Sequence, residues 1–282
     1  MSVVVPTKDR PGFLAHTLET LAGQSFDGDF EIIVVDDGSN PPAAAPDGIR
    51  VVRHPEPRGV NAARNTGAAS ARFDLVCYVD DDIHAPDDWL SEFSAGAQRH
   101  PTASCFAGAI KVRFEGAPIR LCSQCASGPQ EESNLDLDEE EGPTSEYAVG
   151  ANFGVRKEAL GQAGPFDEDH PIYYEEYEWQ NRLRSVGGTV VYLPRAWLWH
   201  RRPEEATRFA ARLQRRIKAG WGNAYYRRSQ GLPVEFGSMA TIVLVGLGHT
   251  VHHRCPNGFL RAVEAFGVLV GGVRFARVRP ST

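Results

Sequence analysis

The sequence predicts an α/β fold with a mostly parallel central sheet, helices on both faces and a helical appendage at the C-terminus. Short apolar runs alternate with amphipathic segments between residues 3 and 99, a pattern typical of buried parallel strands joined by helices. Three of these runs stop abruptly at polar residues. Beyond about residue 203 the sequence changes to basic and apolar helical segments.

The first strand is predicted at residues 3–5. A helix follows from Pro11, because Leu14, Leu18 and Leu21 recur at i, i+4 and i+7 and form one apolar face. This order of strand, short turn and amphipathic helix is the first half of a βαβ unit.

The next elements repeat the pattern. Apolar runs predict strands at residues 32–35, 49–52 and 75–79, and an Ala-rich segment predicts a helix at residues 61–71. Alternating strands and helices with short connections favour a parallel sheet.

Polar residues follow three of these strands, at residues 6–9, 36–38 and 80–82. Three adjacent carboxylates at 80–82 could form a solvated acidic turn. However, the carboxyl ends of neighbouring parallel strands gather at one edge of a sheet, where ligands bind in such folds. We therefore expect a binding site at this edge.

The middle of the chain is less regular. After a predicted helix at 87–99 and a strand at 103–112, the poorly patterned residues 113–146 carry an acidic run at 136–141. Such a run predicts a solvated loop, and the alternative is a loop that orders over the site and helps to select the acceptor. The small residues at 150–153 are typical of a backbone that approaches a ligand closely.

Two glutamates and a late strand follow. Glu175 and Glu176 lie in or just before the first turn of a predicted helix, where the helix dipole favours carboxylates. A strand is predicted at 189–194, and residues 196–200 continue with an alternating pattern towards His200.

Composition restricts the class of protein. The 282 residues contain 42% hydrophobic residues and a net charge of -6, which suits a large folded core and argues against a nucleic-acid partner. Five cysteines without repeated spacing favour a reducing cytoplasm over a disulfide framework. Cys122 and Cys125 have zinc-knuckle spacing but lack a second ligand pair. A strand predicted directly at the N-terminus leads us to expect no signal peptide.

Four segments, in this order and at these spacings, resemble the inverting glycosyltransferases of family 2, which have the GT-A fold. They are residues 3–7, 31–39, 59–67 and 78–82. The resemblance runs from Ser2 to about Arg202. It implies a catalytic domain at 1–203, with a Rossmann-like nucleotide-binding half, and a helical extension at 204–282.

The resemblance also implies which residues bind the donor. The candidate nucleotide-binding residues are Pro6, Thr7, Asp9, Arg10, Asp37, Arg64, Asp80 and Asp81. Asp37 would accept a hydrogen bond from a ring N–H of the base. Asp80 or Asp81 would bond the ribose hydroxyls.

The candidate metal ligands implied by the resemblance are Asp82 and His200, which would bind Mn²⁺ or Mg²⁺. The alternative for His200, taken alone, is a structural imidazole at a strand end that forms hydrogen bonds and binds no metal. The candidate general base is Glu176, with Glu175 as the alternative. The family usually has aspartate at position 176, so one extra methylene shifts the carboxylate here. Both glutamates could also be first-turn carboxylates with no role in proton transfer.

The C-terminal quarter predicts further helices. Phe209, Leu213 and Ile217, at i, i+4 and i+8 among basic residues, predict an amphipathic basic helix. The apolar runs at 239–247 and 266–273 are too short to span a membrane. We expect this region to pack on the catalytic domain, to form a homodimer, or to contact an anionic membrane from the cytoplasmic side.

Taken together, these features predict a metal-dependent inverting glycosyltransferase. Its partners would be a nucleotide-sugar donor, UDP- or dTDP-linked rather than GDP-linked, and a hydroxyl acceptor on a glycan, a lipid-linked molecule or a small molecule. The alternatives are a sugar nucleotidyltransferase and a non-catalytic module that binds nucleotide sugars. The first alternative would favour a glycine-rich loop after the first strand, which residues 6–10 lack.

Overall fold

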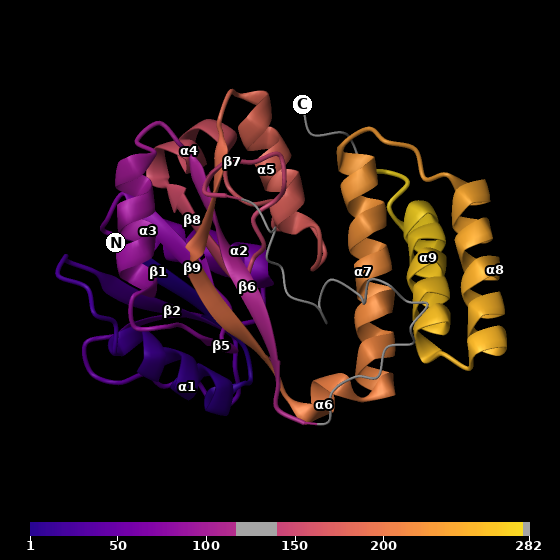
Figure 1. Ribbon diagram of the computed structural model, residues 1–282, viewed down its shortest axis with the longest axis horizontal. Coiled ribbons are helices and arrows are strands. Elements are labelled where there is room, and N and C mark those ends of the chain that lie inside the picture. The colour runs from indigo at the N-terminus through magenta and orange to yellow at the C-terminus, as the bar shows by residue number, and fades with distance from the viewer. Residues whose placement is uncertain (117–139, 279–282) are drawn as a thin grey trace. The chain divides into compact units, whose positions relative to one another are not determined.

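The computed structural model describes residues 1–116 and 140–278 (Figure 1). These residues divide into two compact units. The first contains residues 1–113, 140–168 and 179–201, and the second contains 114–116, 169–178 and 202–278. The segment at 169–178 therefore groups with the C-terminal helices, although it precedes the last strand of the sheet.

The first unit is built on one mixed sheet. Its strands are β1 Ser2–Thr7, β2 Glu31–Asp37, β3 Arg50–His54, β4 Leu75–Val79, β5 Ile83–His84, β6 Cys105–Phe114, β7 Gly142–Pro143, β8 Asn152–Arg156 and β9 Val190–Arg202. They lie in the order β3-β2-β1-β4-β8-β6-β9-β5, and β7 pairs with β9. The predicted parallel half is confirmed, because β1 is parallel to β2 and β4, and β3 is parallel to β2.

The other half of the sheet is antiparallel, which the sequence did not predict. Strand β8 runs antiparallel to β4 and β6, and β5 runs antiparallel to β9. The burial of β9 alternates from Arg195 onward, the pattern of an antiparallel strand with one solvated face. The alternation at 196–200 was the only trace of this arrangement in the sequence.

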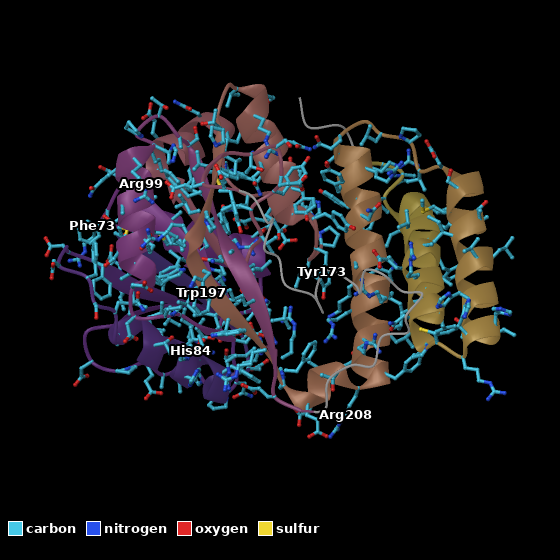
Figure 2. All side chains as sticks on the ribbon, in the orientation of Figure 1. Phe73, His84, Arg99, Tyr173, Trp197 and Arg208 are labelled. Carbon is cyan, nitrogen blue, oxygen red and sulfur yellow. The ribbon has the colours of Figure 1, made fainter. Side chains whose placement is uncertain are left out.

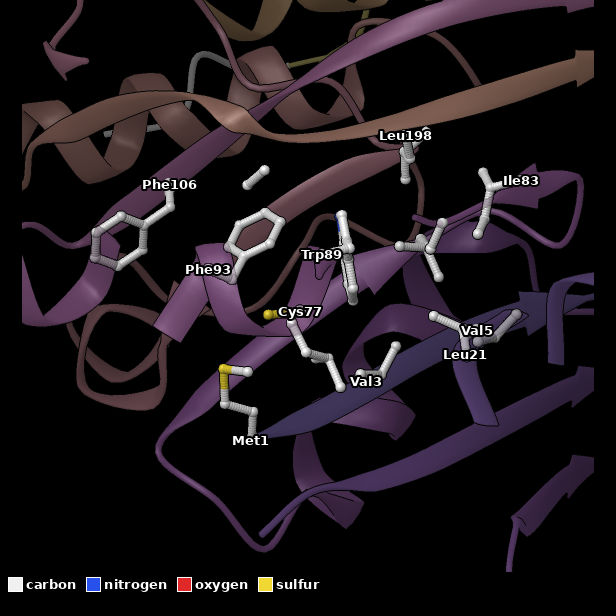
Figure 3. Close-up of a cluster of buried hydrophobic side chains, with 14 of the residues drawn as sticks. Met1, Val3, Val5, Leu21, Cys77, Ile83, Trp89, Phe93, Phe106 and Leu198 are labelled. Atoms are coloured by element: carbon white, nitrogen blue, oxygen red, sulfur yellow. The ribbon is translucent and has the colours of Figure 1, made fainter. Parts of the chain in front are cut away.

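Helices cover both faces of this sheet (Figure 1). They are α1 Pro11–Ala22, α2 Val60–Ser70, α3 Trp89–Arg99, α4 Lys157–Ala163 and α5 Glu175–Ser185. The first four residues of α5 belong to the second unit. Successive residues of β1 point to opposite faces. Val3 and Val5 pack with α1 and α3, as Figure 3 shows for part of this cluster, whereas Val4 packs with α2 and α4.

Asn152 joins several parts of the first unit at its centre. Its buried carboxamide donates to the carbonyl oxygens of Ala109 and Ala196, both at 2.8 Å, and accepts from Trp89 Nε1 at 2.9 Å. We had predicted a close approach of backbone to ligand at residues 150–153. The structure instead places Asn152 in the sheet interior, where it satisfies buried polar groups of β6, β9 and α3.

The second unit contains four helices besides the start of α5: α6 Glu204–Thr207, α7 Phe209–Ser229, α8 Phe236–His253 and α9 Pro256–Arg274. Helix α9 packs against both α7 and α8 and lies between them (Figure 1). Glycines permit the close approach of α8 and α9, because a Cβ on Gly246 would lie 2.5 Å from the Gly258 carbonyl oxygen.

The predicted amphipathic arrangement of α7 is wrong in one respect. Phe209, expected on the packed apolar face, is 46% exposed, whereas Arg212 and Arg216 are buried. Arg212 donates to Asn257 Oδ1 at 2.6 Å and Arg216 pairs with Glu264 at 2.9 Å, both on α9. The two arginines are buried between α7 and α9 because polar partners on α9 compensate for the loss of water.

Some predictions concern residues outside the described ranges. These residues are Cys122, Cys125 and most of the acidic run at 136–141. The predictions of a zinc site and of a solvated or site-covering loop therefore stay predictions. Among the described cysteines, Cys77, Cys105 and Cys255 are free and buried. No helix within 1–116 and 140–278 is long and apolar enough to cross a membrane.

We predict that Asn152→Ala lowers the free energy of unfolding by about 3 kcal/mol, because it leaves the buried Trp89 N–H and two carbonyl groups without partners. Urea denaturation at equilibrium measures this change. Gln98→Ala, at an exposed position of α3, is the control and should change stability by less than about 0.5 kcal/mol. Equal effects of the two substitutions would contradict the role assigned to Asn152.

Candidate active site

The acidic turn between β4 and β5 is the centre of the candidate site. Asp81 and Asp82 are buried, and Asp80 is half-buried. The side chain of Thr17 in α1 contacts the backbone of this turn. Its hydroxyl lies 2.8 Å from the Asp81 carbonyl oxygen and accepts a hydrogen bond from Ile83 N at 3.1 Å. The backbone of the acidic turn is therefore held by a side-chain hydroxyl of the neighbouring helix, a contact that the sequence does not reveal.

His200 reaches this turn through strand pairing. Ile83 of β5 is paired with His200 of β9, and the Arg201 amide donates to the Asp82 carbonyl oxygen at 2.8 Å. As a result, His200 Nε2 lies 2.9 Å from Asp82 Oδ1 and 3.7 Å from Asp80 Oδ2. Two residues that are 118 positions apart in sequence are thus brought into contact, and their predicted role as metal ligands stays a prediction.

Asp80, Asp82 and His200 can hold a metal ion. Each offers one ligand atom, and these atoms all lie within 4.8 Å of one another. Carboxylate oxygens suit both Mg²⁺ and Mn²⁺, and an imidazole nitrogen is acceptable to Mn²⁺. The donor set therefore fits the divalent cation that the family resemblance implies. It adds Asp80, for which, or for Asp81, the resemblance implies a contact with the ribose.

Arg10 neutralises the acidic turn from the other side. Its Nη1 lies 2.5 Å from Asp81 Oδ1 and its Nη2 lies 2.6 Å from Asp82 Oδ2. The Phe13 ring lies below the guanidinium, 4.6 Å from its centre. We predicted Arg10 as a nucleotide ligand, but the guanidinium in this structure occupies the carboxylates. The contact of Arg10 with these carboxylates depends on how α1 packs after β1. The sequence indicates only that a basic residue follows the first strand.

The carboxyl group of Asp81 has a raised pKa. Burial raises its pKa to about 7, and the nearby Arg10 guanidinium offsets only part of this effect. Thr7 Oγ1 donates to Asp81 Oδ2 at 2.7 Å. Thr7 and Asp81 therefore come together, as the convergence of strand ends predicted.

The loops after β1 and β2 are also joined. The Asp9 amide donates to Ser39 Oγ at 2.9 Å, and the Asn40 amide donates to Asp9 Oδ1 at 2.8 Å. Asp9 has a φ of 55°, a left-handed conformation that is uncommon for residues other than glycine. Pro6 lies half-buried in β1 beside Val35. The polar strand ends therefore lie side by side, as expected.

Asp37 organises the entry to α2. Its Oδ1 accepts from Arg58 N at 2.8 Å and lies 2.7 Å from His54 Nδ1, while Oδ2 accepts from Gly59 N at 2.9 Å. These bonds satisfy amide donors just before the helix begins. Its predicted contact with the nucleotide base stays a prediction.

Arg64 of α2 is buried among aromatic side chains. Its guanidinium lies 5.8 Å from the centre of the Phe153 ring and 5.7 Å from that of Phe166, and its Nη1 donates to Asn61 Oδ1 at 3.3 Å. These contacts give Arg64 a packing role within the first unit. Its contact with a nucleotide stays a prediction.

The candidate base belongs to the second unit. Glu175 and Glu176 begin α5 and are both buried. Tyr173 and Tyr174, directly before them, have φ values of 77° and 66°. Two successive left-handed residues are costly and require support from the surroundings.

Helix α7 supplies this support. A Cβ on Gly222 would lie 2.3 Å from the Tyr173 carbonyl oxygen, so only glycine lets this backbone approach the helix. Figure 2 shows Tyr173 beside α7. The Tyr174 ring stacks on Tyr226 with a centroid distance of 5.9 Å. Sequence analysis missed Gly222, because a glycine inside a helix does not indicate what it packs against.

Residues 2–164 match the family model described as glycosyl transferase family 2. The chain belongs to this family. The matched residues include every element from β1 to α4 and the acidic turn between β4 and β5.

A curated relative agrees with this assignment. Over 212 residues the chain is 31% identical to the pre-mycofactocin glycosyltransferase of Mycobacterium tuberculosis, covering 71% of this chain and 42% of that protein. The chain spans 26% to 64% of the lengths of the curated relatives it matches.

Two solved structures share the fold at low identity. S. aureus TarS has a TM-score of 0.55 with 16% identity, over 98% of this chain and 91% of TarS. The mannosyltransferase PcManGT from Pyrobaculum calidifontis has a TM-score of 0.54 with 15% identity, over 98% of this chain and 74% of that one. The predicted GT-A fold is confirmed.

We predict that Arg10→Met increases the affinity of the donor-free protein for Mn²⁺ by about 10-fold, because it removes a positive charge in contact with Asp82. Isothermal titration with Mn²⁺ measures the affinity. Arg195→Met is the matched control, because Arg195 forms an exposed pair with Glu92 and should leave Mn²⁺ binding unchanged. Equal or weaker binding in Arg10→Met would refute the competition between Arg10 and the cation.

We also predict that Gly222→Ala destabilises the protein by about 1–3 kcal/mol, since the new methyl group would force the backbone at Tyr173 away from α7. Gly237→Ala, in helix α8 with open space around its Cβ position, should be neutral or stabilising by up to about 1 kcal/mol. Thermal unfolding of both variants provides the comparison. A neutral Gly222→Ala would show that α7 does not support this segment.

Proposed function

We propose that the chain transfers a sugar from a nucleotide diphosphate sugar to an acceptor hydroxyl, with inversion at the anomeric carbon and with the help of a divalent cation. The observation that carries this proposal is the convergence of Asp80, Asp82 and His200 at the sheet edge where the loops after β1 and β2 also lie. Family membership supports the class of reaction.

Asp82 and His200, together with Asp80, would hold Mn²⁺ or Mg²⁺. When bound, the cation supplies positive charge that stabilises a departing diphosphate. Arg10 lies at these carboxylates and places a second positive charge next to the proposed cation site. Its long side chain could turn from Asp82 towards the diphosphate once a metal ion takes over the carboxylate.

The donor nucleotide would lie along the loops after β1 and β2. Asp37 and Asp9 would face the base, and Asp81 would contact the ribose or support the metal ligands, as the family resemblance implied. A UDP- or dTDP-linked sugar is favoured. Solved relatives support both a uridine and a guanosine donor, since TarS has been determined with UDP-GlcNAc and PcManGT with GDP-Man and Mn²⁺.

Glu176 would act as the general base, with Glu175 as the alternative. An ionised carboxylate at hydrogen-bond distance from the acceptor hydroxyl removes its proton as the oxygen attacks the anomeric carbon. The attack and the departure of the diphosphate occur on opposite faces of the sugar, so the product is inverted. The strained Tyr173 and Tyr174 fix the point at which α5 begins, and thereby the position of both glutamates.

Acceptor and location complete the proposal. The acceptor is a hydroxyl group on a glycan, a lipid-linked molecule or a small molecule, and the protein works in the cytoplasm. The nucleotidyltransferase alternative lacks support, because the loop after β1 contains no phosphate-cradling glycines between Pro6 and Arg10.

Donor binding provides the first test. We expect a UDP- or dTDP-sugar to raise the unfolding temperature in the presence of Mn²⁺ and to do so much less after chelation, because the diphosphate binds through the cation. Thermal-shift measurements with UDP-, dTDP- and GDP-sugars, each with and without Mn²⁺, make the comparison. If no nucleotide diphosphate sugar stabilises the protein under any metal condition, the proposed function is wrong.

Substitution of the base provides the second test. Glu176→Gln should lower turnover ~100-fold or more while leaving donor affinity within about threefold, because a carboxamide binds similarly but cannot accept the proton. Glu176→Asp keeps the carboxylate and should retain part of the activity. Release of nucleoside diphosphate measures turnover. Unchanged turnover in Glu176→Gln, with loss in Glu175→Gln, would move the role to Glu175. Unchanged turnover in both would show that neither glutamate is the base. Donor binding without any release of nucleoside diphosphate by the unmodified chain would favour a non-catalytic binding module.

A further inference from the structure

Helix α8 leaves most of its apolar side chains in solvent. Among its residues only Gly246 is buried, whereas Leu244 is 70% exposed, Val245 66% and Val251 82%. Among the described residues, α8 packs chiefly on α9, and this contact leaves much of the α8 surface uncovered. Soluble surfaces rarely present this many large apolar residues together without a binding role.

Four of the exposed residues of α8 line up along the helix. On α8, Phe236, Leu244, Leu247 and Val251 follow one another at i, i+8, i+11 and i+15, so they share one side of the helix. The large exposed side chains of α8 and α9 together define what we call the α8–α9 apolar surface: Phe236, Ile242, Leu244, Val245, Leu247, Val251, Phe266, Val270 and Val273.

The charge around this surface is mainly positive, although the exposed Glu235 lies directly before Phe236. Between residues 236 and 278 the sequence contains a single acidic residue, Glu264, and its carboxylate is paired with Arg216 at 2.9 Å. The same stretch carries exposed basic side chains at Arg254, Arg261, Arg274 and Arg277.

The same asymmetry extends along the chain. Residues 202–282 contain 13 basic and 4 acidic residues, whereas residues 1–201 contain 17 basic and 32 acidic residues. The positive charge is thus concentrated in the part of the chain that carries the α8–α9 apolar surface.

We propose that the α8–α9 apolar surface docks into the headgroup region of a membrane that contains anionic lipid, with α8 lying in the membrane plane. Apolar side chains would enter the boundary between headgroups and acyl chains, and the arginines would meet lipid phosphates. A second copy of the chain fits less well, because a symmetric contact would bring together two surfaces on which positive charge is in excess.

The make-up of α8 agrees with an in-plane position. Its 18 residues contain no Asp, Glu, Lys or Arg, yet His249, His252 and His253 close to its C-terminus interrupt the apolar run. Arg254 follows in a left-handed conformation and turns the chain towards α9. Polar side chains at the end of an otherwise apolar helix suit the membrane boundary, where they reach water and headgroups.

Vesicle flotation of the full chain tests this proposal. We expect the protein to float with vesicles of phosphatidylcholine and phosphatidylglycerol and to remain in solution with vesicles of phosphatidylcholine alone. Raising the salt concentration should weaken the binding, because arginine–phosphate attraction is screened. Val245→Glu combined with Val251→Glu should lower the bound fraction at least ~10-fold, since both side chains are exposed and the charges oppose insertion.

The matched control places the same two substitutions at exposed valines of the first unit, Val51→Glu and Val186→Glu. This control adds equal charge and should still float. No flotation of the unmodified chain, or equal flotation of both double variants, would overturn the proposal. A dimer in sedimentation velocity that Val245→Glu with Val251→Glu dissolves would instead assign the surface to a second copy. None of these outcomes depends on glycosyl transfer.

Discussion

The structure depends on how three adjacent carboxylates are tolerated at the end of a buried strand. Burial of Asp81 and Asp82 is costly unless positive or polar groups compensate them. Arg10 contributes a guanidinium from the start of α1, and His200 contributes an imidazole from β9. Arg10 and His200 are 190 positions apart in sequence, so the turn is compensated only when α1 and β9 both pack next to it.

Much of this unit could be predicted from the sequence, because local patterns determine its parts. Apolar runs that end in polar residues identified the strands β1, β2 and β4 and the edge at which they meet. The antiparallel half was not predicted, since nothing local determines where β8 inserts. The contacts of Arg10 and Thr17 with the acidic turn could not be predicted either, because they depend on how α1 packs against this turn.

The second unit shows where helical periodicity misleads. Spacing placed Phe209 on the packed face of α7, but Arg212 and Arg216 occupy it because Asn257 and Glu264 on α9 offer them partners. The same helix supports the left-handed residues before Glu175 through Gly222. The C-terminal helices therefore carry two properties at once: they hold the segment with the candidate base and they present the α8–α9 apolar surface. A membrane contact and the proposed proton transfer would thus share one structural support.

The central claim is that Asp80, Asp82 and His200 form one cation site. Pulsed electron paramagnetic resonance of the Mn²⁺-loaded protein tests it most directly, because a directly bound imidazole nitrogen gives a hyperfine coupling to the manganese. We predict this nitrogen coupling in the unmodified chain and its loss in His200→Gln, with Mn²⁺ still bound through the carboxylates. A spectrum without nitrogen coupling in the unmodified chain, or one that His200→Gln leaves unchanged, would contradict the account.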